Sequence, residues 1–204
     1  LMARKTMLHD ESGERIGTAV LFHPAETLDA LPRGVHGNCT PVLASQAEFK
    51  EHLRNEFDDC IGGGLPFGVL WIKVDQAEGL NKTHGAGACQ AMLEKMERAL
   101  ATGLRPAEIL GRWGADEFLV ISHERTAEML TSHARLLVGL ARIADFKWWG
   151  DQVTLSVSIG AAQACPDRGD GLEELLRRAQ QAMEMSAYAG GNRATAAQGG
   201  YECS

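Results

Sequence analysis

The stretch AEILGRWGADEFLVIS, residues 107–122, contains two short apolar runs, AEILGRW and FLVIS, separated by the four residues GADE. Apolar runs of this length are typical of β-strands, and so short a connection joins antiparallel neighbours. The stretch therefore predicts a β-hairpin whose turn carries two adjacent carboxylates, Asp116 and Glu117. These carboxylates are either part of a metal-nucleotide site or solvated residues of a polar turn.

Patterns of apolar residues on both sides of this hairpin predict further helices and strands. Phe49, Leu53 and Phe57 recur at helical spacing, and Ser45 is placed to cap that helix. The expected helices cover about 45–60, 87–103, 126–144 and 172–188, and the expected strands cover about 67–74, 107–113, 118–122 and 153–162. This order predicts an α+β fold in which helices flank a central, mostly antiparallel sheet.

The first 36 residues have a different pattern. The segment HDESGERIGTAVLFHP has a polar turn around Gly13 followed by an apolar run, which predicts a hairpin arm and its last strand. A stretch rich in proline and glycine then predicts a linker. We therefore expect a hairpin remnant and linker at 1–36, one main domain at 37–198 and a short tail at 199–204.

The composition argues against several classes of function. A formal net charge of −7 and a pI near 5.5 disfavour a nucleic-acid-binding surface. The five cysteines are scattered singly, which argues against a disulfide framework or a zinc site and favours a reducing cytoplasm. His84, His123 and His133 show no metal-ligand spacing and are interpreted as surface or helix-face residues.

The sequence also argues against membrane contact within this chain. No run approaches the roughly 18 apolar residues that a membrane-spanning helix needs. The first ten residues lack the apolar core of a signal peptide. We therefore expect a cytoplasmic segment. Because the sequence starts at Leu1, we expect a piece of a longer protein, in which an upstream membrane anchor is compatible with these observations.

Several stretches follow the order and spacing of motifs in a known family. They are the strand that runs into VDQAEGLNKTHG, then RPAEILGRWGADEF, VSIGAA and GGNR, with CTPVLASQAEF as a looser match at the start. The region from about Thr40 to Arg193 resembles the GGDEF domain of diguanylate cyclases, which condense two GTP molecules into cyclic di-GMP. The resemblance implies a ferredoxin-like, nucleotidyl-cyclase-like fold. The hairpin arm before it resembles the last strands of a PAS sensor domain.

The resemblance implies a Mg²⁺ site with two acidic positions. Asp116 matches one of them, with Glu117 behind it. The other stands eight residues before a guanine-binding asparagine, and since Asn81 matches that asparagine, the second position is Lys73. We expect the Lys73 ammonium to pair with Asp116 in place of the metal, with direct contact to a phosphate as the alternative. Asp75 lies roughly 6–7 Å further along, so it is a weak metal candidate.

Other positions implied in nucleotide binding also depart from the family pattern. Its phosphate-binding Lys and Arg correspond to Ala187 and Gly191. Gln90 replaces the acid that reads the guanine edge, and it retains one acceptor without the negative charge. The remaining changes are Ala77 and Glu78 in place of a Phe-Lys pair, and Ala115 in place of the second glycine of the turn, after Gly114. Together these substitutions predict impaired catalysis.

A second ligand site is implied upstream of the hairpin. In the family an R-x-x-D motif there binds cyclic di-GMP as a product inhibitor, and the same offset gives Arg105 and Glu108, with Arg135 near the position of a second arginine. The arginine retains the planar fork that grips phosphate. The alternative is an ordinary surface Arg/Glu pair.

These observations lead to three hypotheses. The first is a degenerate GGDEF domain that acts beside a PAS or other signalling domain by binding cyclic di-GMP or GTP, or by forming a homodimer. The second is an active diguanylate cyclase that uses Mg²⁺ with Asp75, Asp116 and Glu117. The third is a ligand-free dimerisation or interaction module.

Overall fold

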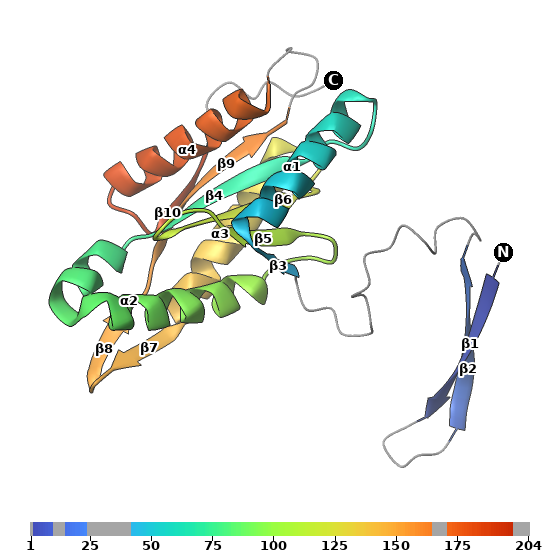
Figure 1. Cartoon of the computed structure of the whole chain (residues 1–204), viewed down its shortest axis with the longest axis horizontal. Helices are drawn as coiled ribbons and strands as arrows, with labels where there is room; N and C mark the ends of the chain where they lie inside the picture. The colour runs from blue at the N-terminus through green and yellow to red at the C-terminus, as the bar shows by residue number, and fades with distance from the viewer. Residues whose placement is uncertain (1, 10–14, 24–41, 165–170, 198–204) are drawn as a thin grey trace. The chain divides into compact units, whose positions relative to one another are not determined.

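The computed structural model describes residues 2–9, 15–23, 42–164 and 171–197. The chain divides into two compact units, Leu1–Cys39 and Thr40–Ser204 (Figure 1). In the first unit β1 (Met2–His9) and β2 (Arg15–His23) pair in antiparallel fashion, as expected for a hairpin arm. The expected linker and the expected tail lie outside the described residues.

A six-stranded sheet forms the centre of the second unit, with the strand order β10-β9-β4-β6-β5-β3. Its strands are β3 (Val42–Ala44), β4 (Gly68–Val74), β5 (Ile109–Arg112), β6 (Glu117–Ser122), β9 (Val157–Gln163) and β10 (Arg193–Ala196). β4 pairs antiparallel with both neighbours, and β5 pairs antiparallel with β6, so the predicted hairpin is confirmed. The strands at the two edges pair in parallel with their neighbours, β3 with β5 and β10 with β9.

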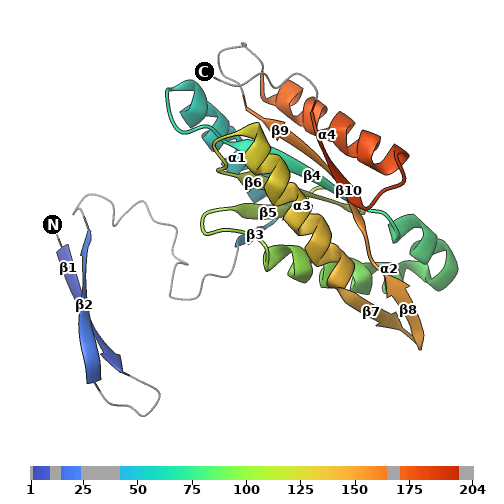
Figure 2. The same ribbon diagram turned by 180° about the vertical axis from the view of Figure 1, so that it is seen from behind.

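Four helices cover the two faces of this sheet. They are α1 (Gln46–Ile61), α2 (Ala77–Ala101), α3 (Ala127–Ile143) and α4 (Leu172–Tyr188). α1 crosses in front of the sheet in Figure 1 and α3 in front of it in Figure 2. The predicted α+β class is confirmed.

Strand β4 explains why the sequence has a continuous apolar run at its centre. Leu70 and Ile72 pack in a cluster with α2 and α3, whereas Val69 and Trp71 pack in a second cluster with α1 and α4. Successive side chains of a strand point to opposite faces, so a strand covered on both faces is apolar throughout. Only Lys73 in this strand is half-buried rather than buried.

Local signals placed most helix boundaries correctly. Ser45 caps α1 in a reciprocal capping box with Glu48, and Thr126 caps α3 by accepting from the Met129 N–H. The expected helix at 87–103 corresponds to the part of α2 after Gly85, but α2 also contains a helical segment from Ala77 that was not predicted. Gly85, at φ 80°, interrupts its helical geometry, and the residues around it are mostly exposed and polar, so no apolar stripe marks this turn.

The expected single strand at 153–162 was also wrong. The structure divides it into β8 (Asp151–Thr154), which pairs with β7 (Asp145–Trp148) in a separate hairpin, and β9. Trp149 and Gly150 form its two-residue turn at φ 48° and 97°, the left-handed pair that suits a tight hairpin. Within the described ranges, no helix is both long and apolar enough to cross a membrane.

Gly160 in the VSIGAA motif allows α4 to lie directly on β9. A Cβ atom there would meet the Ala179 carbonyl oxygen at 2.0 Å and the Met183 amide nitrogen at 2.2 Å. We expect Gly160→Ala to lower the free energy of unfolding by at least about 1–3 kcal/mol, because backbone of α4 would have to move. Urea denaturation measures this.

The matched control is Gly139→Ala in the middle of α3. A Cβ atom at this exposed glycine would meet no other described residue within 4 Å. The substitution should raise the free energy of unfolding by roughly 0.5–1 kcal/mol, since alanine is the better helix former. Equal stability of wild type and Gly160→Ala would contradict the packing of α4 on β9.

Candidate functional site

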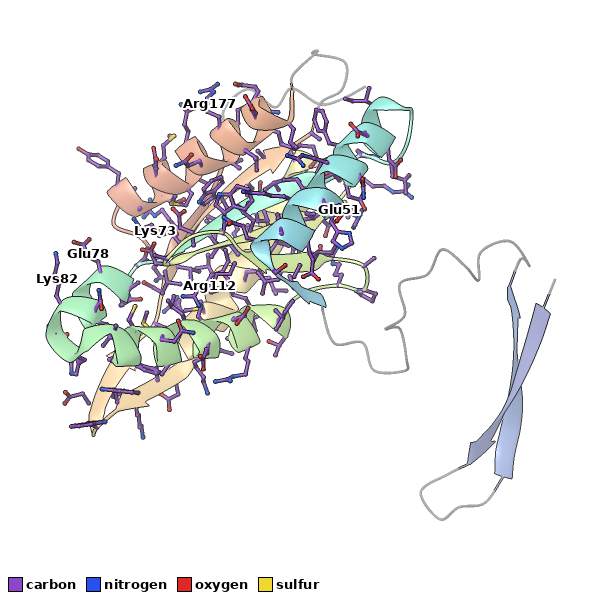
Figure 3. All side chains as sticks on the ribbon, in the orientation of Figure 1. Glu51, Lys73, Glu78, Lys82, Arg112 and Arg177 are labelled. Atoms are coloured by element: carbon purple, nitrogen blue, oxygen red, sulfur yellow. The ribbon has the colours of Figure 1, made fainter. Side chains whose placement is uncertain are left out.

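A cleft of about 320 Å³ lies where β4 ends and α2 begins. Four segments that are distant in the sequence supply its lining residues, which are Lys73, Asp75, Gln76, Glu78, Asp116, Ser156, Ala187, Gly190 and Gly191. In Figure 3 the labelled Lys73 and Glu78 lie close together at this junction. The fold thus gathers the residues at the strand end, the hairpin turn and the end of α4 around one polar cavity.

Some of the predicted site residues lie outside this lining. Asn81 and Gln90 are exposed on α2, and Gly114 and Ala115 form the hairpin turn. Glu117 is the first residue of β6. These five therefore lie around the cleft rather than in its wall.

The Asp75 carboxylate is held by three hydrogen-bond donors. Ser158 Oγ donates to Oδ1 at 2.7 Å, and Ser156 Oγ donates to Oδ2 at 2.6 Å. The Asn192 N–H donates to Oδ2 at 3.0 Å. Asp75 thus ties the end of β4 to β9 and to the loop after α4. Sequence reasoning missed this anchor, although the SVS alternation places two hydroxyls on one face of the chain.

The position of the Asp75 carboxylate explains why residue 191 is a glycine. It has φ 70°, and a Cβ atom there would lie 2.8 Å from Asp75 Oδ2. A side chain at this position would strain the backbone and press on the carboxylate. The loop therefore supplies backbone, and no positive charge, to the wall of the cleft.

The expected ion pair between Lys73 and Asp116 is not formed among the residues that the structure describes. In the strand register Lys73 lies opposite Glu117, and the Asp116 carbonyl accepts from the Val74 N–H at 3.0 Å. Hydrogen bonding by Lys82 is the main reason that the pKa of Glu78 lies below its ordinary value, and the charge of Lys73 adds a small effect in the same direction.

The oxygen atoms that line this cleft do not fit a Mg²⁺ site with two carboxylate ligands. Mg²⁺ requires oxygen ligands at about 2.0–2.1 Å in octahedral geometry. The Asp75 oxygens are already engaged by three donors, and Lys73 places a cation beside Asp116 instead of a second acid. Across 42–164 and 171–197, no group of three His, Cys, Asp or Glu residues is arranged to hold a metal ion.

Arg112, which sequence reasoning also missed, joins the hairpin turn to α2. Its guanidinium donates to Gln90 Oε1 and to the Ala115 carbonyl, both at 3.1 Å. The Gln90 amide in turn donates to Glu94 at 2.9 Å. Figure 3 shows the labelled Arg112 on the side of the sheet where α2 lies. The amide expected to read guanine is therefore held by protein groups.

Glu108 is part of a buried polar network, with 3% of its surface exposed. Its carboxylate accepts from the Arg105 N–H at 2.8 Å and from Ser122 Oγ at 2.6 Å, and it lies 3.2 Å from His133 Nδ1. The other ring nitrogen, Nε2, lies 3.1 Å from the Gly103 carbonyl oxygen. Because carboxylate and carbonyl oxygens both accept, a His133 ring protonated on both nitrogens satisfies both contacts.

This network changes the interpretation of the expected inhibitory site. The Glu108 carboxylate faces the interior, and the Arg105 guanidinium forms an ion pair with the buried Glu124. Arg135 is exposed on α3, and it has no hydrogen bond or ion pair with either residue in the described part of the chain. Arg105 and Glu108 are therefore not both free at the surface to bind a ligand.

His133, interpreted as a surface or helix-face residue, lies on a face of α3 but is buried, with 3% of its surface exposed. It lies three residues after the buried Leu130, on the face of α3 that packs on the sheet. That spacing was a signal for burial. His84 is exposed and pairs with Asp151 at 3.1 Å, as expected for a surface residue.

Burial alone would raise the pKa of Glu108, but hydrogen bonds from His133, Arg105 and Ser122 hold it below its ordinary value of 4.5. A carboxylate with a depressed pKa stabilises the fold above its unfolded pKa and loses that contribution as the pH falls through the folded value. We expect Glu108→Gln to lower the free energy of unfolding at pH 7 by about 3–5 kcal/mol, since a buried partner of His133 loses its charge.

Urea denaturation at pH 7 and at about pH 4 tests this expectation, because the difference between wild type and Glu108→Gln should shrink at the lower pH. The control is Glu51→Gln, at an exposed position on α1 that is labelled in Figure 3. It should change stability by less than about 0.5 kcal/mol at either pH. A difference for Glu108→Gln that is small at pH 7, or equally large at both values, would contradict the role of the buried charge.

The sequence is similar to those of known proteins. Residues 40–193 match the family described as "Diguanylate cyclase, GGDEF domain". Over 144 residues the chain is 33% identical to "Probable diguanylate cyclase DgcC" of Escherichia coli (strain K12), covering 69% of this chain and 38% of that protein. It is 32% identical over 139 residues to "Diguanylate cyclase DosC" of the same strain, covering 64% and 28%. The chain spans well under half the length of these relatives.

Solved structures show the same fold. The GGDEF domain of DgcB from Caulobacter crescentus, in complex with c-di-GMP, matches with a TM-score of 0.71 at 23% identity, covering 82% of this chain and 99% of that one. The GGDEF domain of PA1120 from Pseudomonas aeruginosa matches with a TM-score of 0.70 at 23% identity, covering 76% and 97%. Since the family match extends over most of the sequence, the chain belongs to the diguanylate cyclase GGDEF-domain family.

Proposed function

We propose that this chain is a GGDEF domain of cyclic di-GMP signalling that binds a guanine nucleotide without condensing GTP, and acts as a regulatory module. The observation that carries this proposal is the pair of residues at the end of β4. There Lys73 lines the cleft at the position where the resemblance implies a metal-binding acid. The next carboxylate, Asp75, is engaged by three donors.

The charges of the cleft also favour a binding role over catalysis. Phosphoryl transfer needs metal ions and cationic groups to offset the charge that develops on the phosphates. Ala187 and Gly191 bring no charge, and Lys73 is the one basic side chain among the described lining residues. Asp116 and Glu78 add negative charge to the same wall. A reaction between two triphosphates would therefore lack most of its electrostatic support.

Two features of the cleft support a binding role. The cleft volume of about 320 Å³ is that of a small-molecule site. α2 begins at Ala77, and its N-cap residue Gln76 makes no side-chain cap hydrogen bond, so this helix end retains N–H groups that can donate to an anion. A ligand at Arg105 would instead have to displace its ion pair with Glu124. We therefore favour the cleft over the expected inhibitory site.

An active cyclase is the second candidate. Asp116 remains in the cleft and Glu117 follows it, and the relatives at 32–33% identity are named diguanylate cyclases. Such an enzyme would need Asp75 to release its three donors to bind Mg²⁺ with Asp116. That rearrangement costs the hydrogen bonds that join β4 to β9 and to the loop after α4.

The cellular context of this function is part of the proposal. We propose that the domain acts in the cytoplasm, next to a PAS-like or other signalling domain, either as a homodimer or with an active homologue. The diguanylate cyclase SiaD was solved in complex with its activator SiaC, so proteins of this fold can be controlled by a partner. A ligand-free interaction module is the outcome if no nucleotide binds.

A turnover assay decides between these functions. We expect no cyclic di-GMP above a protein-free blank when the chain is incubated with GTP and Mg²⁺ or Mn²⁺, and chromatography of the products measures this. We also expect GTP to raise the melting temperature, because a ligand selective for the folded state stabilises it. Steady product formation that Asp116→Asn abolishes would establish the cyclase.

Cyclic di-GMP is titrated in the same way, with Arg105→Ala as the diagnostic variant. If this ligand raises the melting temperature of the wild type but not of Arg105→Ala, the Arg105 motif opens to bind it and our preference for the cleft is wrong. If neither GTP nor cyclic di-GMP has an effect at high concentration, the ligand-free module replaces the proposal.

A further inference from the structure

Lys73 is the one cation among the described lining residues of the cleft, and Glu117 lies opposite it in the strand register without forming an ion pair with it. Lys73 is half-buried, and in the described part of the chain it has no hydrogen bond or ion pair. Two of its acidic neighbours in the lining are already engaged, because Asp75 accepts from three donors and Glu78 pairs with Lys82. An ammonium that is partly withdrawn from water without a partner is poised to take an anionic ligand.

From this arrangement, and resting on the proposed function, we propose that the cleft binds its nucleotide without a divalent metal, through direct contact between a phosphate group and the Lys73 ammonium. The ammonium offers three donors, and a hydrogen bond between charged partners is about twice as strong as a neutral one. The position of the cation at the end of β4 places it beside the start of α2.

The start of α2 is held ready for this contact. The Gln76 side chain donates to Ser156 Oγ and accepts from the Ser156 N–H, both at 2.8 Å. These bonds fix the residue that precedes α2 against the segment before β9. The first-turn N–H groups of the helix are therefore ordered before the ligand arrives, which lowers the entropic cost of binding.

A divalent metal would work against this mode of binding. The lining of the cleft does not fit Mg²⁺, since Asp75 is engaged by three hydrogen-bond donors and Glu78 pairs with Lys82, which leaves Asp116 alone among the lining carboxylates. A metal bound to the nucleotide would also bring positive charge toward the ammonium and weaken its attraction for the phosphate. The proposed ligand is therefore a guanine nucleotide in its metal-free form.

Calorimetric titration with GTP in EDTA, and separately in excess Mg²⁺, tests this inference. We expect binding in EDTA to be at least as tight as in Mg²⁺. Lys73→Met should weaken binding in EDTA about tenfold or more, which corresponds to the loss of one charge-assisted hydrogen bond. Lys73→Arg retains the charge and should restore most of the affinity. The matched control is Lys147→Met, which removes an exposed charge on β7 and should leave binding unchanged.

Urea denaturation of each variant confirms that it is folded, and Lys73→Gln replaces Lys73→Met if the latter is not. Binding that requires Mg²⁺ would overturn the metal-free inference and leave the proposed function standing. Binding in EDTA that is unchanged in the folded Lys73 variant would overturn the role of the ammonium. Absence of GTP binding in both media would overturn the proposed function itself, and this inference with it.

Discussion

Strand β4 is hydrogen-bonded along both edges and covered on both faces. The face on which each of its side chains packs is therefore fixed. A shift of one residue in its register would exchange the two sets of core side chains, which pack on different helices. The position of the strand end is fixed in the same way. Lys73 therefore reaches the cleft because the core on either side of β4 leaves no alternative register.

The cleft combines this rigid strand end with a carboxylate that serves as a structural anchor. Asp75 accepts from two serines and one backbone N–H, and the loop that supplies the N–H carries Gly191 against the same oxygens. The presence of an acidic residue near the expected metal position is therefore not enough to infer metal binding. Its hydrogen-bond partners decide whether its oxygens are available.

Local sequence patterns predicted the parts of this molecule that depend on neighbouring residues. The hairpin around Asp116, the cap at Ser45 and the bounds of α4 all follow from short-range rules, and the structure has them. The contacts of the site depend on register and on residues far apart in the chain. The partners of Asp75 are separated from it by more than 80 residues, so no spacing in the sequence identified them.

The pairing of Glu108 with His133 has a consequence for how this chain can diverge. Each side chain is buried, and each needs the other to balance its charge or complete its hydrogen bonds. Substitution of one alone leaves an uncompensated polar group in the interior, whereas replacement of both removes that lone group but still takes the acceptor from Ser122 Oγ. The two positions therefore constrain each other, and descendants that lose this pair must cross an unstable intermediate or change both residues together.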